Sequence, residues 1–118
     1  MTLALYHHTC QHGAESIDAG GGWLMPHPQP VLGGLLLLWA TSVQHPARAE
    51  HLGLTHRLTS CNRLAHTYLL TDPTSVVHWS QFRLGLTRPQ VVTLEAAPGA
   101  RPMLWWVTTQ PQLAAKVR

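Results

Sequence analysis

The sequence predicts a small mixed α+β domain, because short apolar runs alternate with short helical patterns along the chain. Nine prolines and nine glycines keep these segments short. Apolar residues make up 45% of the composition, which argues against disorder and against a coiled coil. At 118 residues we expect one domain over residues 1–118, since two independent cores are improbable at this size.

The first expected elements are a strand and a helix. Residues 2–6 have the alternating apolar pattern of a strand. Residues 11–19 fit a short helix whose Ala14 and Ile17 face inward, and the three glycines at 20–22 are typical of a helix end.

Two further strands are expected before residue 41. Residues 23–25 fit a brief strand, whereas 26–30 is expected to be a loop because its three prolines disfavour regular structure. Residues 35–40 form a nearly continuous apolar run, which is typical of a strand buried on both faces.

The middle of the chain is expected to contain a second helix. It would be capped by Thr41 or Ser42, start near Pro46 and stop at Gly53. The next segment, 57–70, is ambiguous and fits helical spacing only loosely.

The last third of the chain is expected to be rich in strands. Residues 76–79 and 90–94 are candidate strands, Pro98-Gly99 fits a turn, and 103–109 fits a final strand. Since Trp105 and Trp106 would face opposite ways in a strand, we expect one in the core and the other exposed or at an interface.

Composition and charge exclude several functional classes. The net charge is only +3 and the basic residues are scattered, which argues against a nucleic-acid binder. The longest apolar stretch, 31–39, is too short to span a bilayer, and the N-terminus has no signal-peptide pattern. Two isolated thiols, Cys10 and Cys61, favour a reduced, cytoplasmic protein, although a disulfide between them stays an alternative.

Common catalytic motifs are absent from the sequence. Nine histidines occur without the spacing of a zinc site, and Cys10 is more simply a half-buried thiol than a nucleophile. There is no Gly-x-Ser-x-Gly motif, no phosphate-binding Gly-x4-Gly-Lys loop and no dinucleotide fingerprint. We therefore expect no metal site.

After these motifs are excluded, one informative motif is left at the start of the sequence. Tyr6-His7-His8-Thr9, followed by a helix with Ser16-Ile17-x2-Gly20, resembles the start of ADP-ribosyltransferase domains of the diphtheria-toxin and PARP type. In that family a Tyr-His-Gly-Thr strand leads into a helix with Ser-Ile and a glycine. The alignment places His7 on the family histidine and His8 on its glycine.

A second segment agrees in order. Leu38 to Ser42 is similar to the family's apolar strand that ends in an aromatic-x-Thr or aromatic-x-Ser turn. The resemblance implies a compact, ADP-ribosyltransferase-like split antiparallel sheet with short helices. It extends over about residues 3–53 of the sequence.

The resemblance also implies an NAD site. His7 would hold the ribose, Trp39 would form a wall beside the nicotinamide, and Thr41 and Ser42 would lie at the floor of the site. His8 and Thr9 belong to the same motif, but alternation along a strand predicts that His8 points outward, and Thr9 could instead cap the helix.

The catalytic acid is the weakest part of the comparison. The family's glutamate lies on a late strand, and the late acid here is Glu95, directly after 90–94. Either Glu95 is the catalytic residue together with His7, or it is a solvent-facing residue before a turn. The family's paired tyrosines are missing, since Tyr68 is the only later tyrosine.

Together, the resemblance predicts an NAD-dependent transferase that passes ADP-ribose to a protein or nucleic-acid acceptor, or hydrolyses NAD. A chain this short would act in the cell that makes it or be delivered as a toxin or effector, and an antitoxin or other protein could be its partner. The alternatives are a catalytically inactive relative that binds a nucleotide or a protein, and a histidine-rich interaction domain without a ligand.

Overall fold

Eight short strands form two antiparallel sheets in the computed structural model of the protein, which describes residues 3–52 and 62–117. The strand order is β1-β5-β8-β2 in the first sheet and β3-β4-β7-β6 in the second. The strands are β1 (Tyr6–Thr9), β2 (Trp23–Leu24), β3 (His27–Gln29), β4 (Leu35–Ala40), β5 (His66–Leu70), β6 (Val77–His78), β7 (Trp106–Thr108) and β8 (Gln112–Lys116). Two antiparallel sheets with a few short helices confirm the α+β class.

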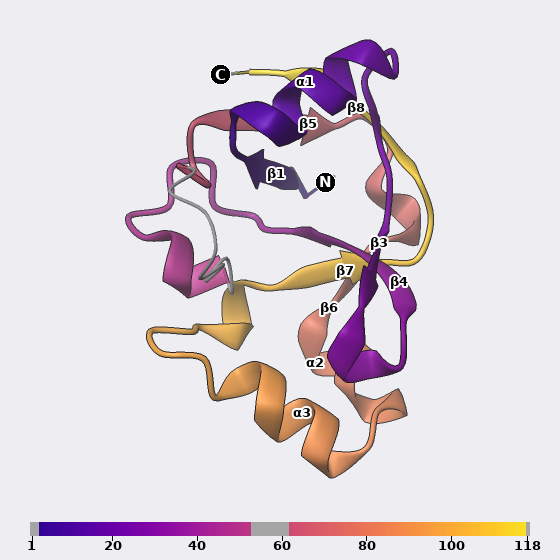
Figure 1. Cartoon of the computed structure of the whole chain (residues 1–118), viewed down its shortest axis with the longest axis vertical. Helices are drawn as coiled ribbons and strands as arrows, with labels where there is room; N and C mark the ends of the chain where they lie inside the picture. The colour runs from indigo at the N-terminus through magenta and orange to yellow at the C-terminus, as the bar shows by residue number, and fades with distance from the viewer. Residues whose placement is uncertain (1–2, 53–61, 118) are drawn as a thin grey trace.

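The helices lie at opposite ends of the molecule. They are α1 (Gln11–Ala19), α2 (Trp79–Phe82) and α3 (Arg88–Glu95), and the 3-10 turns are η1 (Pro30–Leu32), η2 (Ala49–Leu52), η3 (Pro73–Ser75), η4 (Arg83–Gly85) and η5 (Pro102–Leu104). Figure 1 shows α1 over the first sheet at the top and α2 and α3 beyond the second sheet at the bottom.

The N-terminal helix agrees with its prediction and the first strand is shifted. Helix α1 spans the expected residues, and its Ala14 and Ile17 are buried. Strand β1 begins at Tyr6 instead of residue 2, because its register is set by pairing with β5 from Tyr6 to Thr9. The expected helix cap is also different, since Cys10 occupies the N-cap position and Thr9 precedes it.

The proline segment forms a strand, so the loop predicted at 26–30 is wrong. Strand β3 pairs with β4 in the register His27↔Leu37 and Gln29↔Leu35. It lies at the edge of its sheet, where a proline loses no ladder hydrogen bond on the solvent side.

Strand β4 has the predicted bounds but is not buried on both faces throughout. Leu35 and Leu36 are 39% and 49% exposed, because this half of the strand pairs only with the edge strand β3. The other half, from Leu38 to Ala40, pairs with the inner strand β7 and is largely buried.

The second predicted helix is replaced by a single 3-10 turn, η2, and Thr41 and Ser42 cap no helix there. Its predicted end at Gly53 lies outside the described residues. The ambiguous segment 57–70 also falls partly outside them, and its described end forms strand β5.

The segment 90–94 is helical, so the strand predicted there is wrong. Helix α3 begins with a capping box in which the Thr87 side chain accepts from the Gln90 backbone N–H and Gln90 accepts from the Thr87 backbone N–H. A cap at both orphan donors outweighs the β-branched character of Val91, Val92 and Thr93. Glu95 is therefore the last residue of a helix.

The C-terminal strands differ in length from the prediction. The strand expected at 76–79 ends at His78 because Trp79 begins α2, and the strand expected at 103–109 is shortened to β7 by η5. The turn at Pro98-Gly99 is present, with Gly99 at a positive φ of 78°. Strand β8 was not predicted, although it joins β5 to β2 in the first sheet.

Two hydrophobic clusters lie on either side of strand β4. The first contains Leu38 and Ala40 of β4 together with α1 and first-sheet residues (Leu5, Ala14, Ile17, Leu24, Tyr68, Leu70, Val76 and Ala114). The second contains Leu37, with Trp39 packed against it, and the residues Leu32, Trp79, Trp105 and Val107. Alternate side chains of one strand therefore enter different clusters.

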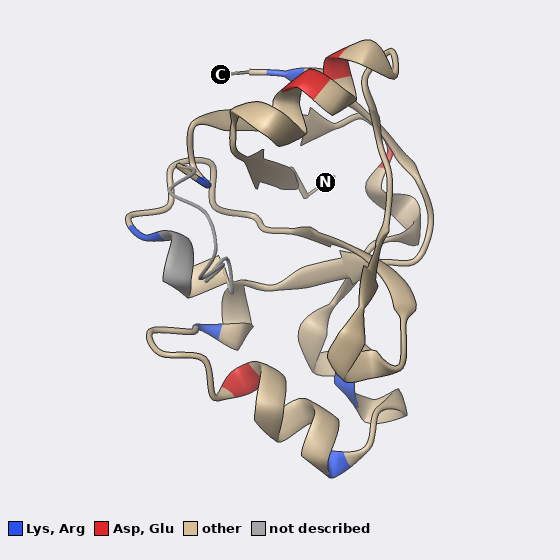
Figure 2. Cartoon of the chain, in the orientation of Figure 1, with Lys and Arg blue, Asp and Glu red and all other residues tan. Residues whose placement is uncertain are grey.

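Charged residues are spread over separate elements (Figure 2). Lys116 lies in β8, Arg83 in η4 and Arg88 in α3, and two of the acids, Glu15 and Asp18, lie on α1. No helix within residues 3–52 and 62–117 is long and apolar enough to cross a membrane.

Candidate functional site

The candidate site lies where the two sheets meet. Tyr6 at the start of β1 and Thr41 just after β4 form an isolated antiparallel bridge. The Tyr6 N–H donates to the Thr41 carbonyl at 2.7 Å, and the Thr41 N–H donates to the Tyr6 carbonyl at 2.9 Å. This bridge brings the histidine pair of β1 beside the aromatic end of β4.

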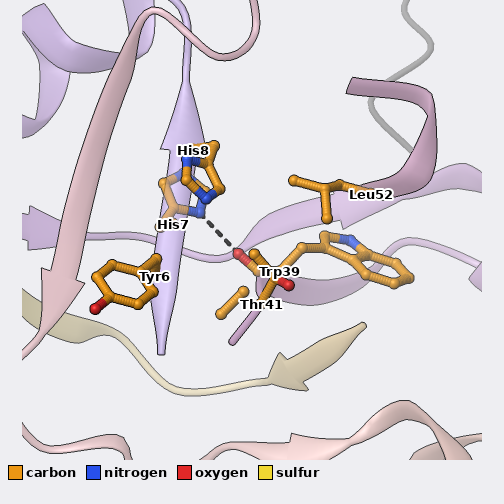
Figure 3. Close-up of a pocket in the computed structure, with 7 residues that line it drawn as sticks. Tyr6, His7, His8, Trp39, Thr41 and Leu52 are labelled. Atoms are coloured by element: carbon orange, nitrogen blue, oxygen red, sulfur yellow. Dashed lines mark hydrogen bonds between the residues drawn. The ribbon is translucent and has the colours of Figure 1, made fainter. Parts of the chain in front are cut away.

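A small pocket opens beside this bridge, with an empty volume of about 290 Å³ that is continuous with solvent. It is lined by residues from β1, from the end of β4 and from η2, namely Tyr6, His7, His8, Trp39, Ala40, Thr41 and Leu52. Figure 3 shows His7 and His8 on one side and Trp39 and Leu52 on the other.

His7 forms the polar side of the pocket. Its Nδ1 lies 2.8 Å from the carbonyl oxygen of Trp39, and since a carbonyl can only accept, Nδ1–H is the donor. Removal of the ring from water lowers the pKa of His7 to about 4, although the hydrogen bond to the Trp39 carbonyl by itself raises it. At neutral pH the ring is therefore uncharged and its Nε2 is a hydrogen-bond acceptor.

His8 has a structural role in addition to lining the pocket. Its Nε2–H donates to the Val43 carbonyl at 2.9 Å, and its Nδ1 accepts from the Thr67 hydroxyl at 3.0 Å. The side chain is only 5% exposed, so the prediction that His8 points outward is wrong. The two neighbouring rings thus bond backbone carbonyls through different nitrogens, Nδ1 of His7 and Nε2 of His8.

Trp39 and Thr41 also line the pocket, as the resemblance implies for an NAD site. Thr41 is 2% exposed and its hydroxyl accepts from the Val43 N–H at 3.2 Å. Thr9 and Ser42 are not among the lining residues. Thr9 is buried and packs against Gly13 of α1, whereas Ser42 is exposed.

Glu95 does not line this pocket. It lies at the C-terminal end of α3, where its Oε2 accepts from Trp79 Nε1–H at 2.7 Å. The Nε of Arg83 is 3.5 Å from the same oxygen. The structure therefore brings together His7, His8, Trp39 and Thr41 of the predicted site, but not Thr9, Ser42 or Glu95.

Three lining residues were not predicted from the sequence. Tyr6 is part of the motif without a role in the expected site, Ala40 belongs to the apolar run, and Leu52 falls in the segment expected to be the second helix. Leu52 lies in η2 and lines the pocket from there. Because Leu52 is distant in sequence from the motif, no local pattern predicts that it lies beside it.

Metal ligation and thiol chemistry find little support in the described part of the chain. No group of three or more His, Cys, Asp or Glu side chains there could hold a metal ion. The thiol of the buried Cys10 lies 4.0 Å from Nδ1 of His12 on α1, outside the pocket.

Comparison with known proteins gives no family for this chain. No protein-family model, no curated protein and no solved structure matches it at the threshold for a significant match. The functional inference therefore depends on the pocket and on the motif that leads to it.

Proposed function

We propose that this chain is an ADP-ribosyltransferase-like domain that binds NAD in the pocket between β1 and β4. One observation carries the proposal. Four residues that the motif resemblance assigns to NAD, His7, His8, Trp39 and Thr41, come from two segments distant in sequence and line one pocket.

The chemistry of the pocket suits the nicotinamide riboside half of NAD. The neutral His7 ring offers Nε2 as an acceptor for a ribose hydroxyl, and the Trp39 ring offers a flat face for the pyridine ring. In the reaction the bond between ribose C1′ and nicotinamide nitrogen would break, and nicotinamide would leave with the electron pair. A hydroxyl or amine of a macromolecule, or water, would then add to C1′ and release its proton to solvent.

Binding is tested by isothermal titration of the protein with NAD. We expect heat of binding from the wild type, and a loss of affinity of at least tenfold for His7→Ala because the ribose acceptor is removed. His12→Ala is the matched control, since His12 is exposed on α1 and does not line the pocket. Absence of binding at millimolar NAD would sink the proposal, and an unchanged affinity of His7→Ala would remove His7 from the site.

A second candidate is a catalytically inactive relative that binds a nucleotide or a protein partner. The position of Glu95 favours it, because its carboxylate is bonded to Trp79 and Arg83 instead of lining the pocket. A developing positive charge on the ribose needs a nearby negative group. None of the seven lining residues carries a carboxylate.

Nicotinamide release separates these candidates. The chain has five acids, so each can be replaced in turn by its amide: Glu15, Asp18, Glu50, Asp72 and Glu95. For an active transferase, one replacement lowers the rate of nicotinamide release by about a hundredfold or more. For an inactive relative, NAD binds without release in the wild type. An unchanged rate for Glu95→Gln would exclude Glu95 as the catalytic acid.

A further inference from the structure

The carboxylate of Glu95 has a defined partner inside the second cluster. Its Oε2 accepts a 2.7 Å hydrogen bond from the indole Nε1–H of Trp79 and lies 3.5 Å from Nε of Arg83. The Trp79 side chain is only 1% exposed. A buried indole N–H needs an acceptor, so Glu95 fixes the direction in which this ring points.

Trp79 packs directly on the pocket residue Trp39. The two ring centroids are 5.5 Å apart and the rings are tilted by 32°. Trp105 lies at 5.4 Å from each of them, nearly perpendicular to Trp39. These three tryptophans, here called the tryptophan cluster, are close-packed, so a change in the plane of Trp79 must be absorbed by its neighbours.

The tryptophan cluster holds a second part of the pocket as well. The Trp105 Nε1–H donates to the carbonyl of His51 at 2.9 Å. His51 precedes Leu52 in η2, and Leu52 lines the pocket opposite the histidines. The cluster therefore supports both the Trp39 wall and the Leu52 wall.

We propose that Glu95 is a positioning residue that sets the Trp39 wall of the pocket by holding Trp79. As a statement about NAD, this inference rests on the proposed function. Glu95 acts through Trp79 and touches no ligand. The opening motif and the late glutamate are thereby joined through two aromatic rings, Trp79 and Trp39, rather than through a shared contact with the substrate.

A double-mutant cycle on NAD affinity tests this inference. Glu95→Ala leaves the Trp79 N–H without its acceptor, and we expect a loss of affinity of about tenfold. Trp79→Phe removes the N–H while keeping an aromatic ring, and we expect a loss in the same range. The double variant should bind NAD no more weakly than whichever single variant has the lower affinity, because both substitutions remove the same contact.

Two further variants make the test specific. Glu95→Gln keeps a carbonyl oxygen that can accept from Trp79, so it should restore most of the wild-type affinity. Glu15→Ala, an exposed acid on α1, should bind NAD like the wild type. Losses that multiply in the double variant, or a Glu95→Gln variant as weak as Glu95→Ala, would overturn the inference.

A spectroscopic arm separates failure of this inference from failure of the proposed function. Near-ultraviolet circular dichroism reports the coupling of the tryptophan rings without any ligand. We expect the tryptophan bands to change in Glu95→Ala and to be retained in Glu95→Gln. If the wild type binds no NAD, the proposed function fails. Unchanged bands in a folded Glu95→Ala would show that Glu95 does not position the cluster.

Discussion

The two walls of the pocket are held by different forces. On the β1 side, His7 and His8 are fixed by hydrogen bonds to Trp39, Val43 and Thr67. On the β4 side, the Trp39 ring is held by aromatic packing within the tryptophan cluster. The first wall should therefore respond to protonation and the second to changes in side-chain volume.

The largest expected effect is loss of packing on the β4 side. Trp79→Ala removes the largest fully buried side chain and should lower the free energy of unfolding by about 3–5 kcal/mol. Since domains of this kind have about 5–15 kcal/mol in total, the variant should be close to unfolding. Urea denaturation measures it. A loss below about 1 kcal/mol would contradict a packed wall.

The second-largest expected effect is the loss of stability when His7, on the β1 side, is protonated. The folded-state pKa of His7, about 4, lies below its ordinary value of 6.5. Between these values the unfolded chain binds the extra proton, so stability falls as the pH drops from 6.5 towards 4. The loss of stability is at most about 3.5 kcal/mol, from about 1.4 kcal/mol per pKa unit.

The pH effect is isolated by comparing urea denaturation of the wild type and His7→Gln across that range. The difference between the two curves should be constant above about pH 7, where it reports the lost contacts of the ring, and should shift against the wild type in acid, because the other histidines contribute equally to both proteins. A constant difference at all pH values would show that His7 titrates normally.

The two hydrogen bonds of His8, here called the His8 tether, should contribute less to the free energy of unfolding. His8→Ala leaves the Val43 carbonyl and the Thr67 hydroxyl without the ring and should cost about 1–3 kcal/mol. His45→Ala, at an exposed position in the segment after β4, should change stability by less than about 0.5 kcal/mol. Thermal unfolding of the three proteins side by side would measure both. Equal stability of the two variants would argue against the tether.

The smallest effect concerns the helix that carries Glu95. Thr87→Ala removes half of the capping box of α3 and should cost about 1 kcal/mol. The matched control is Thr93→Ala, whose hydroxyl bonds only the Pro89 carbonyl one turn back in the same helix. The midpoint of urea denaturation should be the same for the wild type and Thr93→Ala, and it should be lower for Thr87→Ala.

Local sequence patterns predicted some elements well. The helix at Gln11–Ala19 and the strand at Leu35–Ala40 have the predicted bounds, because each carries its own periodicity and end signals. The proline strand β3 was missed because edge position depends on the sheet and not on the segment. Strand β8 was missed because its two alanines and lysine do not favour a strand.

The site was predictable only where it was local. The motif predicts a site role for His7 and the aromatic turn predicts one for Trp39 and Thr41, and these three residues line one pocket. The strand assignment of Glu95 failed because Thr87-Arg88-Pro89-Gln90 is a helix start, a signal that was present in the sequence. The tertiary partner of Glu95 could not be predicted, since Trp79 lies 16 positions earlier in the chain.

The fold should be sensitive to the insertion or deletion of residues within strand β4. Leu38 and Ala40 enter the first cluster, and Leu37 and Trp39 belong with the second. Inserting or deleting one residue between Gly34 and Thr41 would exchange these sets and remove Trp39 from the pocket at the same time. Substitutions along β4 act on one cluster each, so this strand should accept many changes of identity and almost no change of length.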